Sequence, residues 1–115
     1  MSTQRYYLSI ADLAHARGEN PAFSFQGVSA ESFAQALQAA LREPTLWQEW
    51  SADQTDPDSI DPALGQTDPS ATVSAKQADL HVDIEVVTSL SHTILKHRLA
   101  LLAGHSWELH DVKPA

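Results

Sequence analysis

The chain has 115 residues, of which 43% are hydrophobic and 19% charged, so we expect one folded domain over residues 1–115 and not a disordered or divided chain. Its 15 acidic and 7 basic residues give a formal net charge of -8, a surface that repels phosphate backbones and anionic lipid, so neither nucleic acid nor a membrane is expected as a partner. The absence of cysteine excludes disulfides and thiolate metal sites, and a chain without a signal-peptide pattern or a membrane-spanning run is expected in the cytoplasm.

The N-terminal part of the chain predicts two short strands. Residues 5–10 alternate apolar and polar side chains, which is the pattern of a strand with one buried face. The segment 11–17, which precedes Gly18, fits either one or two helical turns or a loop, and both interpretations stay open. The stretch 22–26 alternates large and small residues before Gly27 and predicts a second short strand.

The clearest element is a helix over residues 30–43. Ser29 can cap its first turn, Glu31 complements the positive end of the helix dipole, and Pro44 ends it. Apolar residues form one stripe along this helix: Phe33, Leu37, Ala40 and Leu41. Such a stripe is expected to face the core.

Two tryptophans, Trp47 and Trp50, lie in a further helical turn that begins near Thr45. They are three residues apart and share one face of that turn. Large aromatic side chains on one face anchor either a protein partner or the core of the domain itself. The core is the favoured interpretation, and both residues stay candidates for an interaction site.

The composition changes over residues 51–70, which we interpret as an acidic loop rich in proline and aspartate. Three Asp-Pro pairs interrupt any regular period, and no basic residue occurs there. A loop of this length in a small domain is either functional or mobile. Ile60 and Leu64 could fix its middle to the body of the domain.

The C-terminal part predicts a strand, a helix and a last strand. Aliphatic residues at every second position over 80–86 predict a strand with one dry and one wet face, and residues 71–77 either extend it or pair with it. Residues 94–103 predict a helix closed by Gly104. A last short strand is expected over residues 107–112.

Arg98 complicates the helical interpretation, because it falls inside the apolar arc of that helix. An extended alternative would place residues 91–103 in an antiparallel meander, but strand-favouring β-branched residues are scarce there, so the helix is favoured. A guanidinium within an apolar face must meet a carboxylate or reach past the core to water. Asp83, Glu85 and Asp111 are the expected partners, and structural pairing is favoured over an interaction role for Arg98.

These elements together predict a small α+β domain. Its sheet is expected to be mostly antiparallel or mixed, with about four strands, and to be accompanied by two main helices. An exposed edge of such a sheet could pair with a second copy of the chain, so a homodimer is among the expected states.

Four polar residues could form a metal site: His81, Asp83, Glu85 and His110. The first three share one face of the strand predicted over 80–86, and His110 would face the same way from the last strand. Imidazole and carboxylate groups suit hard or borderline metal ions if the two strands are neighbours. The favoured interpretation is the solvated face of a half-buried sheet, and no cofactor is expected.

The sequence favours a non-enzymatic protein-interaction domain, an adaptor or a regulator, over an enzyme. It contains no glycine-rich phosphate loop and no H-E-x-x-H motif, and its charge can attract a basic protein. The sheet edge, the tryptophan turn and the acidic loop are the candidate contact surfaces. Two alternatives stay open: a metal- or small-molecule-binding protein that uses the His/Asp/Glu cluster, and an acidic mimic of nucleic acid.

Overall fold

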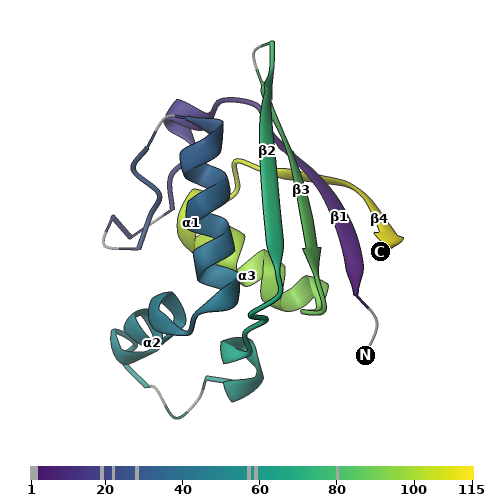
Figure 1. Cartoon of the computed structure of the whole chain (residues 1–115). Helices are drawn as coiled ribbons and strands as arrows, with labels where there is room; N and C mark the ends of the chain where they lie inside the picture. The colour runs from purple at the N-terminus through teal and green to yellow at the C-terminus, as the bar shows by residue number, and fades with distance from the viewer. Residues whose placement is uncertain are drawn as a thin grey trace.

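The chain forms two layers, a β-sheet and a layer of helices on one face of that sheet (Figure 1). A computed structural model describes residues 3–18, 20–21, 23–27, 29–56, 58, 60–79 and 81–115. In chain order its elements are β1 (Gln4–Ile10), the 3-10 helix η1 (Leu13–His15), α1 (Ala30–Arg42), α2 (Thr45–Ala52), the 3-10 helix η3 (Pro62–Gly65), β2 (Thr72–Ala78), β3 (His81–Thr88), α3 (His92–Ala103) and β4 (Glu108–Pro114). Within the described ranges no helix has the length and apolarity that crossing a membrane requires.

The sheet is antiparallel throughout, with the strand order β2-β3-β1-β4. β1 and β3 therefore occupy its centre, and β2 and β4 form its edges. The order β1-α1-β2-β3-α3-β4 is the ferredoxin-like arrangement, in which a β-α-β unit is split by another strand. The prediction of a small α+β domain with a mostly antiparallel sheet of about four strands is confirmed. This arrangement carries many different functions in proteins, so it assigns none by itself.

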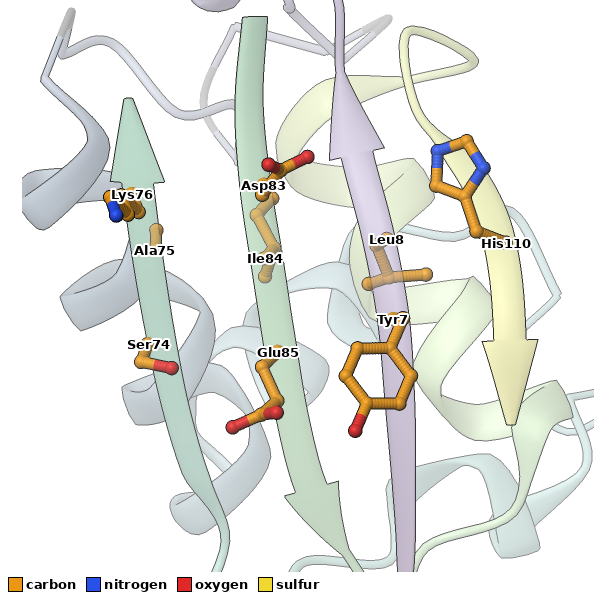
Figure 2. Close-up of a pocket in the computed structure, with 9 residues that line it drawn as sticks. All are labelled: Tyr7, Leu8, Ser74, Ala75, Lys76, Asp83, Ile84, Glu85 and His110. Atoms are coloured by element: carbon orange, nitrogen blue, oxygen red, sulfur yellow. The ribbon is translucent and has the colours of Figure 1, made fainter. Parts of the chain in front are cut away.

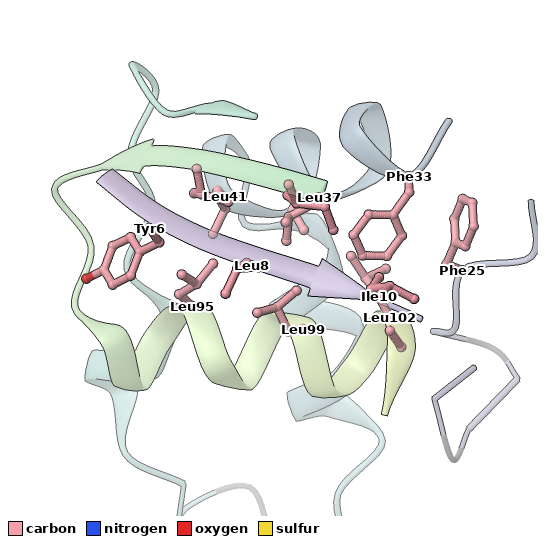
Figure 3. Close-up of a cluster of buried hydrophobic side chains, with 14 of the residues drawn as sticks. Tyr6, Leu8, Ile10, Phe25, Phe33, Leu37, Leu41, Leu95, Leu99 and Leu102 are labelled. Atoms are coloured by element: carbon pink, nitrogen blue, oxygen red, sulfur yellow. The ribbon is translucent and has the colours of Figure 1, made fainter. Parts of the chain in front are cut away.

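The core lies between the sheet and the helices α1 and α3 (Figure 3). β1 and β3 turn every second side chain inward, because successive residues of a strand point to opposite faces. α1 adds the apolar stripe predicted from its sequence. The Phe25 ring meets the Phe33 ring edge-on, with centroids 5.1 Å apart, and the Tyr6 hydroxyl donates to the Leu90 carbonyl at 3.1 Å.

Local signals set the ends of the long helices. Ser29 caps α1 by accepting a hydrogen bond from the Ser32 N–H, and Ser91 caps α3 in the same way. Gly104 ends α3 at a φ of 62°, a left-handed conformation that glycine adopts without strain. The predicted helix is therefore confirmed, and the extended alternative for residues 91–103 is wrong.

The strands of the C-terminal half form a hairpin and an edge. β3 confirms the strand predicted from the period-two pattern, while Leu80 lies outside the described residues. β2 pairs with β3, so the segment upstream is a partner of the strand and not its extension. β4 confirms the last strand, which runs on to Pro114.

The strand predicted over residues 22–26 is wrong. Its described residues, 23–26, form a turn and a loop, and Ala22 lies outside the described part. Phe25 is buried, as the alternation predicts, but its N–H donates to the Leu102 carbonyl at the end of α3 at 2.9 Å. The backbone here satisfies a helix end and does not join the sheet.

Two segments differ in detail from the sequence interpretation. The segment 11–17, which was open between a helix and a loop, holds the short 3-10 helix η1. The acidic loop predicted over residues 51–70 contains regular structure. Its first two residues belong to α2, which continues to Ala52, and η3 forms within it over Pro62–Gly65.

Candidate functional site

Arg98 joins three separated segments of the chain through main-chain carbonyls. Its side chain is fully buried. The guanidinium donates hydrogen bonds to the carbonyl oxygens of Ala40 (3.3 Å), Leu64 (2.7 Å) and Gln66 (3.2 Å). Ala40 lies in the last turn of α1, where carbonyls lack a helical partner and form the negative end of the helix dipole. The buried cation is therefore stabilised by carbonyl dipoles at the point where α1, α3 and η3 meet.

The carboxylates expected to pair with Arg98 lie elsewhere. Asp83 and Glu85 stand on the face of β3 that points away from the helices (Figure 2), and Asp111 lies 3.7 Å from Lys113. The expectation of a carboxylate partner is wrong, because α3 turns Arg98 toward the end of α1 and not toward the sheet.

His97 precedes Arg98 in α3, and its imidazole contacts the guanidinium. Its Nδ1 lies 3.3 Å from Arg98 Nη1, and because a guanidinium only donates, Nδ1 accepts and the ring proton sits on Nε2. Burial lowers the pKa of His97 below its usual 6.5, and the charge of Arg98 lowers it further. Trp50 meets the imidazole edge-on, with centroids 4.4 Å apart. The neutral ring is thus part of the packing between α2 and α3.

Both tryptophans of α2 are half-buried and attach this helix to the rest of the domain. Trp50 contacts His97, and Trp47 covers Gly65 of η3 so closely that a Cβ at Gly65 would come within 2.9 Å of the indole. α2 has no fully buried residue of its own. The contacts of these two rings therefore help to hold α2 against η3 and α3.

Asp68 fixes the chain just after η3 to the end of β3. Its carboxylate accepts from the Thr88 hydroxyl (2.8 Å), the Ser89 N–H (3.0 Å) and the Ser70 N–H (3.0 Å). Its own N–H donates to the Leu41 carbonyl at the end of α1 (2.8 Å). Partial burial by itself raises the pKa of Asp68, but these hydrogen bonds outweigh it, so the pKa is lowered overall. The part of the predicted acidic loop from η3 to Asp68 is therefore built into the fold.

These contacts support a surface that we call the acidic lobe, defined as the described residues 45–56, 58 and 60–65. Its exposed carboxylates are Glu49, Asp53, Asp56, Asp58 and Asp61. No Lys, Arg or His occurs in the sequence between Arg42 and Lys76. Arg42 donates through Nε to the Ala71 carbonyl (2.6 Å), and Arg98 is committed to carbonyls inside the domain. The lobe therefore presents a concentration of negative charge that the sequence around it does not balance.

The outer face of the sheet, which we call the open face, is the second exposed surface. The helices lie on the other side of the sheet (Figure 1), and the open face has a shallow hollow of about 490 Å³ lined by residues of all four strands (Figure 2). Its charges are largely matched, since Arg5 lies 3.8 Å from Glu85 and Lys113 lies 3.7 Å from Asp111. Lys113 also lies over the Tyr7 ring, 5.7 Å from its centroid. The open face is therefore mixed in charge, unlike the acidic lobe.

The four residues predicted to bind a metal lie on the open face, and only two of them, His81 and Asp83, are in contact. His81 Nε2 is 3.2 Å from Asp83 Oδ1, whereas Glu85 pairs with Arg5. His110 stands on β4, and β1 separates β4 from β3. Among the described residues no group of three or more His, Asp or Glu side chains is placed to hold a metal ion.

One polar pair on the open face escaped the sequence analysis. Ser9 Oγ and His110 Nε2 are hydrogen-bonded at 2.6 Å. The two residues lie near opposite ends of the chain, so no local spacing could have revealed the contact. A serine next to a histidine is one part of a nucleophilic site, but such a site also needs a group that orients the base and donors for an oxyanion. In the described part of the chain no hydrogen bond to the second ring nitrogen of His110 completes that arrangement.

Comparison of the chain with protein-family models, with curated proteins and with solved structures found no match. Its function is therefore inferred from its own residues and their arrangement.

Proposed function

We propose that the protein is a non-enzymatic protein-interaction domain whose acidic lobe binds a basic segment of another protein. A partner of this kind would bring lysine and arginine side chains to the carboxylates of the lobe. Complementary charge accelerates encounter and discriminates against partners of the wrong sign. The proposal thus assigns the lobe a role in partner choice.

The observation that carries the proposal is the environment of Arg98. This residue contacts η3 directly, because its guanidinium donates to the carbonyl of Leu64 in η3 and to that of Gln66 just after it. Its guanidinium is held by these carbonyls and is not accessible to a partner, since the side chain is fully buried. Exposed carboxylates of the lobe, such as Glu49 and Asp58, can interact with solvent or with a partner.

The anchoring of the lobe also favours binding. A surface that is already ordered loses less conformational entropy when a partner docks than a flexible acidic loop would lose. The contacts that order it are the Arg98 hydrogen bonds, the packing of Trp47 on Gly65 and the carboxylate of Asp68. These contacts involve the interior of the lobe and leave its acidic side chains exposed.

The open face supports a protein partner better than a nucleic acid. An uncovered antiparallel sheet can bind single-stranded RNA when aromatic side chains on its central strands stack with bases. Here the aromatic residue at the centre is Tyr7, and its neighbours across the two adjacent strands are Glu85 and Asp111. Each of these carboxylates is matched by a cation, Arg5 or Lys113, so the surface beside the ring has no excess of positive charge to bind a phosphate backbone.

The proposal is tested by capturing partners from a native lysate of the source cells with three forms of the protein. The first is the wild type, and the second is a lobe variant with Glu49→Gln, Asp53→Asn and Asp58→Asn. The third is a control with the same net charge as the lobe variant but with the changes elsewhere: Glu31→Gln, Asp79→Asn and Asp83→Asn. Asn suits position 79, where φ is 59°.

We expect the wild type and the control to retain a stoichiometric basic protein that the lobe variant loses. Retention should also fall as salt rises from about 0.1 M to about 1 M, because the screening length shortens from about 10 Å to about 3 Å. If no protein is retained at any salt concentration, or if the lobe variant retains it as well as the control does, the proposal is wrong. If DNA competes with this protein for the captured partner, the protein is instead a mimic of nucleic acid.

A further inference from the structure

The two edge strands of the sheet, β2 and β4, differ in how well they are shielded from pairing with another strand. At β2, Gln38 of α1 reaches over the edge and its side-chain oxygen accepts from the Val73 N–H at 3.0 Å. At β4, six of the seven residues are exposed, and Leu109 is half-buried. Val112 is the exposed large hydrophobic residue of the described chain, at 39% of its full accessibility. β4 therefore leaves its outer backbone groups without such a cover, while its charged side chains and its bulge restrict the strands that can pair with it.

From Glu108 to Lys113, the sequence of faces to which the side chains of β4 point is symmetric about the centre of the strand. Leu109 and Val112 pair with the buried residues Leu8 and Tyr6 of β1, so both lie on the helix side. Glu108, Asp111 and Lys113 pair with Ser9, Tyr7 and Arg5, which lie on the open face. The register shifts between Asp111 and Leu109, and the extra residue His110 also turns to the open face, where it bonds to Ser9.

We propose that β4 pairs antiparallel with β4 of a second copy, around a two-fold axis between His110 and Asp111. That register places Glu108 opposite Lys113, Leu109 opposite Val112 and His110 opposite Asp111, and the symmetry makes each pair twice. Every pair joins opposite charges, an apolar couple or an imidazole and a carboxylate, which are favourable cross-strand combinations. The bulge is essential to this match, because without it these partners would face opposite sides of the sheet.

Neighbouring registers are less favourable. A shift of one residue in one direction places Asp111 opposite Asp111, and like charges that are directly opposed repel. A shift in the other direction places Leu109 opposite Asp111 and Glu108 opposite Val112, so apolar side chains face carboxylates and no favourable pair is left. Charge complementarity therefore selects one arrangement of the two copies. This selection is the argument for a second copy as the occupant of the edge.

The expected dimer is weak. A single pair of short edge strands buries less surface than the roughly 1,200–2,000 Å² of stable interfaces. The Val112 N–H also donates to Asp111 Oδ1 within the chain at 2.8 Å, and pairing must exchange this bond for one to the second copy. The dimer would join the sheets of the two copies, and their acidic lobes would lie away from the joined edges (Figure 1).

The test is the self-association of the full chain measured by sedimentation from about 1 µM to about 1 mM. We expect a monomer–dimer equilibrium for the wild type and at least about a tenfold weaker one for Glu108→Lys and for Lys113→Glu, since each reversal places like charges together at two symmetric contacts. The double exchange, Glu108→Lys with Lys113→Glu, should restore association to within about threefold of the wild type. Lys76→Glu on the other edge strand is the matched control and should leave association unchanged.

The register can be tested separately, because the chain has no cysteine of its own. A Glu108→Cys chain mixed with a Lys113→Cys chain should form the mixed disulfide in preference to either symmetric one, since the two sites lie directly opposite. A wild type that stays monomeric over the whole range, or a double exchange that fails to restore association, would overturn the proposal. A monomer that still captures a basic protein through its lobe would refute the dimer alone, and a dimer that captures nothing would refute the proposed function alone.

Discussion

The guanidinium of Arg98 donates a 2.7 Å hydrogen bond to the main-chain carbonyl of Leu64, and so α3 holds η3 at a distance of 34 residues along the chain. The same side chain reaches the end of α1 through the Ala40 carbonyl. Arg98 therefore anchors the acidic lobe to the domain, and its buried guanidinium is not available on the surface of the lobe. The stability of the domain and the charge of its proposed binding surface are thus linked through one residue.

Replacing Arg98 should destabilise the domain strongly. In Arg98→Met the side chain keeps much of its volume, but one buried and two part-buried carbonyls lose their donor at about 1 kcal/mol each, so we expect a loss of about 3 kcal/mol in the free energy of unfolding. Urea unfolding followed by circular dichroism measures this loss. Arg5→Met, which removes a cation from a partly exposed ion pair, is the control and should destabilise the domain much less than Arg98→Met does. Equal effects of the two substitutions would contradict the role assigned to Arg98.

The stability of the domain should decrease as the pH falls through the titration range of histidine. The pKa of His97 in the folded chain is lowered from 6.5 by burial and by Arg98, so between its folded pKa and 6.5 the unfolded chain binds more protons than the folded chain. Proton uptake then favours unfolding, and the stability present above pH 6.5 is lost as the pH decreases. The thermal midpoint, measured from about pH 8 to about pH 5, should show this decline.

The variant His97→Phe separates this residue from the other histidines. A phenyl ring preserves the aromatic contact with Trp50 but does not titrate, so the decline between about pH 8 and about pH 5 should be shallower than in the wild type. An NMR titration of the wild type provides the direct value. A pKa for His97 above 6.5 would contradict the neutral ring beside Arg98.

Asp68 should contribute to stability at neutral pH and lose that contribution in acid. Its folded pKa is lowered, because the hydrogen bonds from Ser89, Thr88 and Ser70 outweigh the effect of burial, so its contribution is present above about 3.8 and disappears as the pH falls through the folded value. Asp68→Ala should cost about 1–3 kcal/mol at neutral pH, since the buried Thr88 hydroxyl loses its acceptor.

A second aspartate of the same segment is the control for this prediction. Asp58 is exposed, so Asp58→Ala should change the free energy of unfolding by no more than about 0.5 kcal/mol. Chemical unfolding at neutral pH compares the two variants. Similar small effects for both would show that Asp68 does not fasten the chain after η3.

Much of the fold was predictable because local patterns determine it. The alternation of Tyr6, Leu8 and Ile10 marked β1, and the serine caps and Gly104 marked the ends of the long helices. The stretch 22–26 misled because an alternating pattern reports which side chains are buried and not where the backbone bonds. There the backbone satisfies the end of α3.

The candidate site was less predictable. The apolar arc around Arg98 indicated that the residue is buried, but its partners are carbonyls, which every residue possesses and no sequence pattern distinguishes. The hydrogen bond between Ser9 and His110 and the bulge in β4 depend on strand register across the whole chain. Composition did locate the acidic segment, although the contacts that order part of it could be found only in three dimensions.

The most direct test of the acidic lobe as a binding surface is the dissociation constant of the complex with the captured partner, measured calorimetrically at low and high salt. We predict that the wild-type complex weakens as salt increases, and that the variant with Glu49→Gln, Asp53→Asn and Asp58→Asn binds at least about tenfold more weakly at low salt and responds less to added salt. An affinity that is unchanged by these three substitutions, or one that the matched control reduces equally, would contradict it.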